Sequence, residues 1–431
     1  MADPTFQSAV IYVSRSDLSS VFKTQLKEIG VENCLTVEGL ENAVETLLRH
    51  EDALLVLDWG IGAAKAIAVL ESISSPVRAD VRPIFLFSSS EQKGLDGVAM
   101  EYSVTKIHSG DMSPKVIKDH LVDLMKVELM PTEVRDQIRV VADSRRRDDW
   151  EAAGRLLEEL YEKHKDIPRV VIEYAENLFH LDTCADARTA LEPLTETDKP
   201  DSRALNLLGR IHLKEGNHEK ASVVLQKAKL INPYNIDRLI NLGDAYLAIN
   251  KVERAKANFE EALEHGSEDK RAVEGMSKSL LMGDQVNEAL VFLKQLSGAR
   301  EMASVFNTAA VLSMHNGRFS EGMKLYKVAL ETIDGEKAVM GKLGFNMGIG
   351  FHRQGDLSRA KHCFALAAAI DPKNEKARTN FEALKRSGGD VVIPDDMGDK
   401  IEALKNLWVE GESAARDVLG ESDHSEEEDV C

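Results

Sequence analysis

Cysteine, aromatic residues and long apolar runs are all scarce in this sequence. Only four cysteines occur among 431 residues, at positions 34, 184, 363 and 431, and their spacing suits neither a metal site nor a framework of disulfides. The longest apolar runs, such as 53–57 and 84–87, fall far short of the ~20 residues that a membrane helix needs. We therefore expect reduced thiols and no membrane insertion.

Positive charge is also in short supply. The formal net charge is −19, from 54 Lys and Arg against 73 Asp and Glu. A nucleic-acid surface needs clustered Lys and Arg to displace counterions from phosphates, whereas the basic cluster 145–147 runs directly into Asp148 and Asp149. The sequence therefore predicts no nucleic-acid partner.

Signals for export and for catalysis are missing as well. Residues 1–24 lack a basic start followed by an apolar stretch and a small-residue cleavage site, so a cytoplasmic location is expected. No region combines a nucleophile with a base, a phosphate-binding loop or a cluster of metal ligands. We expect a protein that is not an enzyme and that carries no resident cofactor.

What the chain does contain is a repeat of 34 residues between Val134 and Asn374. The clearest unit spans Ser202 to Asn235 and carries the marker residues Leu208, Gly209, Ala221, Leu225, Ala228 and Pro233. At the corresponding positions of the next unit stand Leu242, Gly243, Ala255, Phe259 and Ala262. The other units start near Val134, Pro168, Lys270, Ala303 and Gly341, which makes seven in all.

The pattern resembles the tetratricopeptide repeat, whose period and marker residues it matches. The resemblance is strong over Ser202–Gly266 and Gly341–Pro372 but weaker over Val134–Pro200, where a helical solenoid outside this family is the alternative. It implies helical hairpins that stack into an all-α solenoid, because no hairpin can bury its apolar face alone. Such arrays hold other proteins.

This resemblance also points to a peptide-binding groove on the inner helices. Asn amides can both donate to and accept from a peptide backbone, and basic side chains suit acidic residues or a terminal carboxylate. Acids at equivalent positions, such as Asp237, Asp244 and Glu274, make the groove mixed in charge, and each candidate taken singly could be an ordinary exposed residue. The candidates are Arg203, Asn206, Arg210, Asn241, Lys278, Asn307 and Asn346.

Before the repeats, short apolar segments alternate with helical ones. Strands are expected at 9–13, 53–58, 83–87 and 102–107, and helices at 18–29, 39–50, 63–73 and 113–127. Alternation of this kind predicts an α/β sandwich around a parallel sheet. Its functional edge is the carboxyl end of the strands, where we expect Asp58, Ser88 and Lys106.

That trio resembles a two-component receiver domain of the flavodoxin-like fold, with the likeness spanning Gln7 to Glu128. The resemblance makes Asp58 the candidate phospho-acceptor, and Ser88 and Lys106 the candidate switch residues. Residues 13–16, however, read Val-Ser-Arg-Ser where receivers place the acidic pair that holds magnesium. The receiver-like domain therefore looks degenerate, and magnesium is needed only if it is active.

Two interpretations of Asp58 remain open. In the first, Asp58, Lys106 and Arg15 are remnants that pair in a buried ionic cluster. In the second, Asp58 is still phosphorylated and Arg15 replaces the metal.

The sequence thus predicts a multidomain chain with four parts. These are a receiver-like domain at 1–128, a repeat solenoid with a capping helix at 129–386, a C-terminal amphipathic helix region at 387–419 and an acidic, disordered tail at 420–431. The amphipathic segment either packs back onto the last repeat or acts as a detachable partner helix. The tail either adds solubility or occupies the basic groove positions.

Two functional hypotheses follow. The first is a non-enzymatic signalling adaptor that binds protein partners or peptide segments through its repeats, with the degenerate receiver as a second docking surface. The alternative is a phosphorylation-responsive response regulator with a repeat-type output. The receiver resemblance implies bacterial phosphorelay signalling, with a histidine kinase or a motility or polarity complex as the partner.

Overall fold

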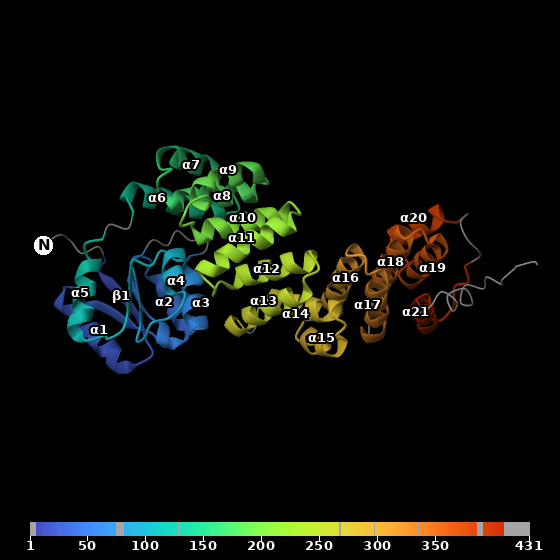
Figure 1. Cartoon of the computed structure of the whole chain (residues 1–431), viewed down its shortest axis with the longest axis horizontal. Coiled ribbons are helices and arrows are strands. Elements are labelled where there is room, and N and C mark those ends of the chain that lie inside the picture. The colour runs from blue at the N-terminus through green and yellow to red at the C-terminus, as the bar shows by residue number, and fades with distance from the viewer. Residues whose placement is uncertain are drawn as a thin grey trace, which may run out of the picture. The chain divides into compact units, whose positions relative to one another are not determined.

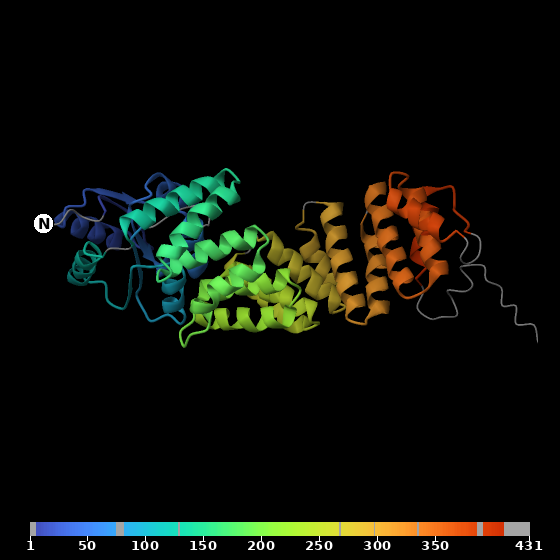
Figure 2. The ribbon, with the colours of Figure 1, turned by 90° about the horizontal axis from the view of Figure 1, so that it is seen from above.

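The computed structural model describes residues 6–74, 82–127, 130–266, 269–296, 298–333, 336–385 and 391–408. Figures 1 and 2 show the helices and strands from two directions. The chain forms two compact units. Unit 1 comprises residues 1–245 and 261–267, and unit 2 comprises residues 246–260 and 268–431.

Unit 1 begins with a five-stranded parallel sheet in the order β2-β1-β3-β4-β5. The strands are β1 (Ser8–Tyr12), β2 (Asn33–Thr36), β3 (Leu54–Asp58), β4 (Ile84–Ser88) and β5 (Lys106–Ser109). This order fits the flavodoxin-like arrangement of doubly wound sheets. The central strands β3 and β4 are buried at every position because helices cover both faces of the sheet, which is why they read as continuous apolar runs.

Among the residues described in this region, five helices surround the sheet, with a short 3-10 turn, η1 (Trp59–Ile61), after β3. They are α1 (Ser16–Glu28), α2 (Leu40–Arg49), α3 (Ala63–Ile73), α4 (Leu95–Glu101) and α5 (Pro114–Leu124). One apolar core joins α1 and α5 to the sheet through residues such as Phe22 and Leu121. A second core joins α2, α3 and α4 to the opposite face. We call β1 to α5 the α/β region.

Two elements of this region, β2 and α4, were not predicted from the sequence, and the last predicted strand is misplaced. The edge strand β2 is only four residues long and only partly buried, so it carries little apolar pattern. Helix α4 is short and contains Gly97, a poor helix former. The strand expected at 102–107 is wrong, because Tyr102 ends α4 and β5 begins only at Lys106.

After the α/β region, seven pairs of helices follow in chain order within the described residues. In unit 1 or spanning its boundary these are α6 (Thr132–Arg146) with α7 (Trp150–Lys163), α8 (Pro168–His180) with α9 (Cys184–Thr195), α10 (Ser202–Lys214) with α11 (His218–Ile231), and α12 (Ile236–Ala248) with α13 (Val252–His265). The last three are α14 (Lys270–Met282) with α15 (Val286–Leu293), α16 (Ala299–His315) with α17 (Phe319–Thr332), and α18 (Lys337–Arg353) with α19 (Leu357–Ile370).

The small-residue positions of the repeat are where two helices of a pair come close. Ala153, Ala187 and Ala221 are fully buried, as the pattern predicts. A Cβ on Gly209 would lie 2.4 Å from Leu225 Cδ2, so a larger residue at that point of α10 would force the Leu225 side chain of α11 to move.

The turn inside each helix pair carries a left-handed residue that the sequence reading overlooked. Positive φ angles occur at Asp148, Asp182, Gly216, Asn250, Asp284, Gly317 and Gly355. The first five recur every 34 residues, and the last two depart from this spacing, as the later repeat units do in the sequence. Gly, Asn and Asp are the residues that most readily adopt this conformation after a helix, so this signal was readable in advance.

The last described helices of unit 2 are α20 (Glu375–Ala383) and α21 (Met397–Asn406). Helix α21 contacts α17 and α19, with Leu404 fully buried. The Trp408 ring lies 6.1 Å from that of Phe319 and 6.5 Å from that of Phe351. The expectation that the amphipathic segment packs back onto the last repeat is confirmed as far as residue 408, whereas 409–419 and the acidic tail 420–431 lie outside the described residues. None of the described helices combines the length and hydropathy that a bilayer span requires.

Candidate functional site

The carboxyl edge of the sheet holds Asp58, which is 3% exposed. Its Oδ2 accepts hydrogen bonds from the backbone N–H of Ser14 at 2.9 Å and from the Ser14 hydroxyl at 2.5 Å. Its Oδ1 accepts the Gly60 N–H at 2.7 Å. The carboxylate is therefore held by neutral donors of the two neighbouring loops.

The structure contradicts the predicted ionic cluster. Lys106 is the first residue of β5 and is level with Phe85, so it lies at the amino end of its strand, away from Asp58. It pairs with Asp123 at 3.4 Å, and Arg15 pairs with Asp17 at 2.8 Å. The expectation that Lys106 is a cationic switch residue beside Asp58 is therefore wrong, and its cause is the misplaced start of β5.

Ser88 does lie at the expected edge, at the end of β4, and is buried. Its hydroxyl accepts the Ser90 N–H at 3.4 Å. The residue level with it on β5 is Ser109, which brings a hydroxyl rather than a cation. In the part of the chain that the structure describes, no group of three or more His, Cys, Asp or Glu side chains is arranged for a metal ion.

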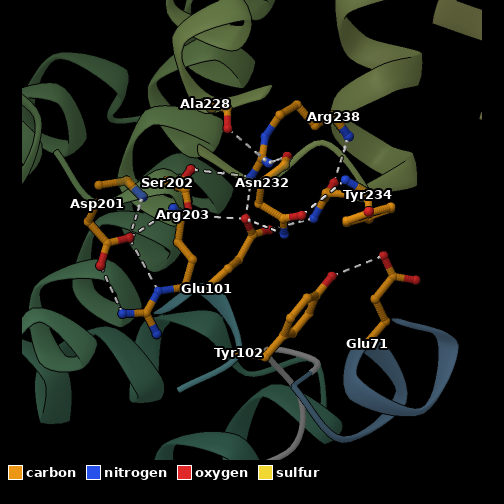
Figure 3. Close-up of polar contacts among 12 residues, drawn as sticks. Glu71, Glu101, Tyr102, Asp201, Ser202, Arg203, Ala228, Asn232, Tyr234 and Arg238 are labelled. Atoms are coloured by element: carbon orange, nitrogen blue, oxygen red, sulfur yellow. Dashed lines mark hydrogen bonds and ion pairs between the residues drawn. The ribbon is translucent and has the colours of Figure 1, made fainter. Parts of the chain in front are cut away.

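A second cluster joins α4 to the repeats inside unit 1, and Figure 3 shows it. The Glu101 carboxylate is 4% exposed. Its Oε2 accepts from Ser202 Oγ at 3.0 Å, Asn232 Nδ2 at 2.9 Å and Arg238 Nη2 at 2.7 Å. Its Oε1 accepts from Asn235 Nδ2 at 2.7 Å. We call these four donor residues the Glu101 cradle.

Arg238 is the charged member of the cradle, and its side chain is fully buried. Besides Glu101, its guanidinium donates to the carbonyl oxygens of Asn232 at 2.6 Å, Ala228 at 3.3 Å and Ser202 at 3.4 Å. These carbonyl groups accept from Nη1 and Nη2 but do not neutralise the charge, and Nε has no hydrogen-bond partner among the described residues. The carboxylate from α4 supplies the counter-charge within this buried network.

The same interface is closely fitted in shape. A Cβ on Gly97, one turn before Glu101, would lie 1.7 Å from the carbonyl oxygen of Ile231, so only glycine allows α4 to approach the end of α11. The Trp59 ring meets the Tyr234 ring edge-on, with 5.3 Å between centroids. The Tyr234 hydroxyl donates to the Lys93 carbonyl at 3.1 Å. This interface was not predicted from the sequence because α4 was not.

Arg203, predicted to line the groove, belongs to this interface instead. Its Nη1 donates to the Ser103 hydroxyl at 3.1 Å, and its Nη2 pairs with Asp201 at 2.9 Å. Burial on its own would raise the pKa of Asp201, but the hydrogen bonds and charge of Arg203 outweigh burial and lower that pKa. Arg203 thus has partners within the chain (Figure 3).

Arg210 is likewise occupied, since its Nη1 pairs with Glu176 Oε1 at 2.9 Å and its guanidinium carbon lies 4.7 Å from the Phe179 ring centroid. Asn206 is half-buried, with its Oδ1 unpartnered among the described residues. Asn241 is half-buried, and Lys278 lies 4.0 Å from Glu274. Arg210, Asn206 and Asn241 belong to unit 1, and Lys278 belongs to unit 2.

The structure does bring together the last two groove candidates, Asn307 and Asn346. They line a cavity of about 250 Å³ between α16 and α18, in unit 2. Asn346 Nδ2 donates to Asn307 Oδ1 at 2.7 Å. Alongside them the cavity is lined by Arg300, Ala303, Ser304, Ala338, Val339, Lys342 and Leu343. We call this cavity the α16/α18 hollow.

Tyr326 of α17 sets the orientation of the Asn307 amide. Its hydroxyl donates to Asn307 Oδ1 at 2.8 Å, and burial raises the pKa of Tyr326 well above its ordinary value of 10.0, so this hydroxyl stays protonated. Because Asn307 Oδ1 accepts two bonds, the Asn307 NH₂ group and the Asn346 carbonyl oxygen remain as a donor and an acceptor toward the hollow.

The charge at the hollow is basic. Lys342 is exposed and no ion pair engages it among the described residues. Arg300 pairs with Glu336 at 2.9 Å, but their side chains are 78% and 58% exposed, and such a pair exchanges readily for another acid. The hollow therefore combines an amide pair suited to backbone with cations suited to carboxylates.

Two family models match the helical part of the chain. Residues 181–235 and residues 236–264 each match a model described as a tetratricopeptide repeat. No curated protein sequence matches this chain.

Several solved structures are similar to it at low identity. A tetratricopeptide repeat protein from Parabacteroides merdae is 16% identical, covers 59% of this chain and 100% of its own, and has a TM-score of 0.39. MamA from Desulfovibrio magneticus is 19% identical over 38% of this chain and 94% of its own, with a TM-score of 0.35. YrrB, described as having an unusual peptide-binding site, is 15% identical over 52% of this chain and 97% of its own, with a TM-score of 0.31.

The matched segments coincide with α9 to α13, and the left-handed turns repeat at the same period on both sides of them. Residues 181–264 therefore carry tetratricopeptide repeats.

Proposed function

We propose that this protein is a non-enzymatic adaptor that holds acidic peptide segments of other proteins in the α16/α18 hollow. The observation that carries the proposal is the Asn307–Asn346 pair, oriented by Tyr326 and flanked by Lys342. An extended peptide can accept from the Asn307 NH₂ and donate to the Asn346 carbonyl, while its acidic side chains meet the cations.

The α/β region fits a degenerate receiver-like domain. Its strand order and the place of Asp58 at the end of β3 support this assignment. The carboxyl edge of the sheet differs from that of a phosphorylation switch. The Ser14 hydroxyl donates a hydrogen bond to the Asp58 carboxylate, and Lys106 lies at the amino end of its strand. These features favour an adaptor over a phosphorylation-responsive regulator. A role in bacterial signalling belongs to the same proposal.

The test is binding of fluorescently labelled short peptides, graded from neutral to acidic, to the full-length protein. We expect affinity to rise with acidic content and to fall about tenfold or more in Lys342→Glu and in Asn307→Ala. Lys376→Glu makes the same charge change on α20, where the side chain is exposed, and should bind as the wild type does. Equal binding by Lys342→Glu, Asn307→Ala and the wild type would refute the proposal.

A further inference from the structure

The contact between α4 and the repeats centres on the carboxylate of Glu101. Four side chains converge on one carboxylate, with donor–acceptor distances between 2.7 and 3.0 Å. Both charged side chains are almost inaccessible, at 0% and 4% exposure. The Glu101 carboxylate is therefore enclosed as a bound ligand would be, and its ion pair with Arg238 is excluded from water.

The cradle comes from parts of the repeats that the repeat itself does not require. Ser202 starts α10, and Asn232, Asn235 and Arg238 lie in the turn between α11 and α12 and in the first turn of α12. Asn235 Oδ1 accepts the Arg238 N–H at 2.7 Å, and Asn232 Oδ1 accepts the Tyr234 N–H at 3.0 Å. These bonds hold both amides so that their NH₂ groups point at Glu101.

We propose that the Glu101 cradle is an intramolecular docking site whose ligand is the end of α4, and that it locks the α/β region to the repeats. Gly97 supplies the fit in shape and Glu101 the charge. Without the carboxylate, Arg238 would be a buried charge without a counter-charge. The docked state is therefore the stable one.

The lock has a consequence for partners. The Tyr234 turn packs on Trp59, the residue that follows Asp58, and on the loop at Lys93 and Gly94. The α4 face and the adjoining part of the sheet edge are therefore occupied by the chain itself. A partner of the α/β region has to use another face.

The test is amide hydrogen exchange on the full-length protein, comparing wild type with Glu101→Ala. We expect exchange in α4 and in the first turns of α10 and α12 to rise together, by about a hundredfold, while β3 stays protected. Gly97→Leu should give the same pattern by steric clash alone, so the outcome does not depend on one variant.

Asp52→Ala is the matched control. Asp52 also joins the α/β region to the repeats, by pairing with Arg139 of α6 at 2.5 Å, but its side chain is 70% exposed, so exchange should stay within about twofold of wild type. Unchanged exchange at α10 and α12 in both Glu101→Ala and Gly97→Leu would overturn the lock. So would a rise confined to α4. Neither outcome bears on peptide binding at the α16/α18 hollow, which is measured separately.

Discussion

The Glu101 cradle and the α16/α18 hollow have similar side chains but different roles, because the first binds a residue of the same chain and the second is open to a partner. Each sets Asn amides beside a basic side chain on the helix pairs. In the cradle all four residues donate to the Glu101 carboxylate of the same chain, whereas the hollow leaves an amide donor, an amide acceptor and Lys342 available. The difference teaches that side-chain type alone does not identify a binding site in such an array, because a group already satisfied internally has nothing to offer a partner.

The largest effect that would sharpen this comparison is expected from Arg238→Ala. Removing one partner of a buried ion pair leaves the other charge uncompensated, so the free energy of unfolding should fall by about 3–5 kcal/mol. Urea unfolding followed by circular dichroism measures it. The matched change at the hollow, Arg300→Ala, breaks an exposed pair and should cost no more than about 1 kcal/mol. Similar losses in both variants would remove the distinction between the two sites.

A smaller effect is expected from substituting Glu176, which pairs with the groove candidate Arg210. Burial raises the pKa of Glu176, but the hydrogen bond from His180 and the charge and hydrogen bonds of Arg210 outweigh burial and hold the pKa below its ordinary value of 4.5. A depressed pKa contributes stability above pH 4.5 that is lost as the pH falls below it.

Wild type should therefore exceed Glu176→Gln in stability at neutral pH by about 1–2 kcal/mol. Urea unfolding at a series of pH values should show that margin shrinking as the pH drops below 4.5. A margin that stays constant or grows on acidification would mean that Glu176 does not hold its charge through Arg210.

Next in size is Tyr326→Phe, which tests how the hollow is held open for a ligand. Loss of the hydroxyl removes one bond to Asn307 and should cost about 1 kcal/mol of folding stability. It also frees the amide to turn, so acidic peptides should bind more weakly than to the wild type. Retained peptide affinity together with lost stability would separate the packing role of Tyr326 from the orienting role assigned to it here.

The smallest effect is expected from Lys106→Ala. Its pair with Asp123 is 3.4 Å long, with side chains 32% and 59% exposed, so the change in unfolding free energy should stay within about 0.5 kcal/mol. Thermal unfolding is sufficient to measure it. A loss of several kcal/mol would imply that Lys106 meets a buried charge after all, as the ionic-cluster interpretation required.

Local sequence determined most of the helical part. The 34-residue period, the small residues and the Gly, Asn or Asp turns act within one or two neighbouring helices, so the pattern is visible without the fold. The central strands were readable for a similar reason, since burial on both faces leaves a continuous apolar run.

Tertiary structure alone decided which candidate residues are free. Asn307 and Asn346 were predicted and lie in an open hollow, whereas Arg203 and Arg210 were predicted on the same grounds and are bound by Asp201 and Glu176. Glu101 and Arg238 are 137 residues apart, and nothing local marks either one. Pairing between distant residues depends on how the elements pack, so the short α4, its glycine and its buried carboxylate acquire meaning only in the folded chain.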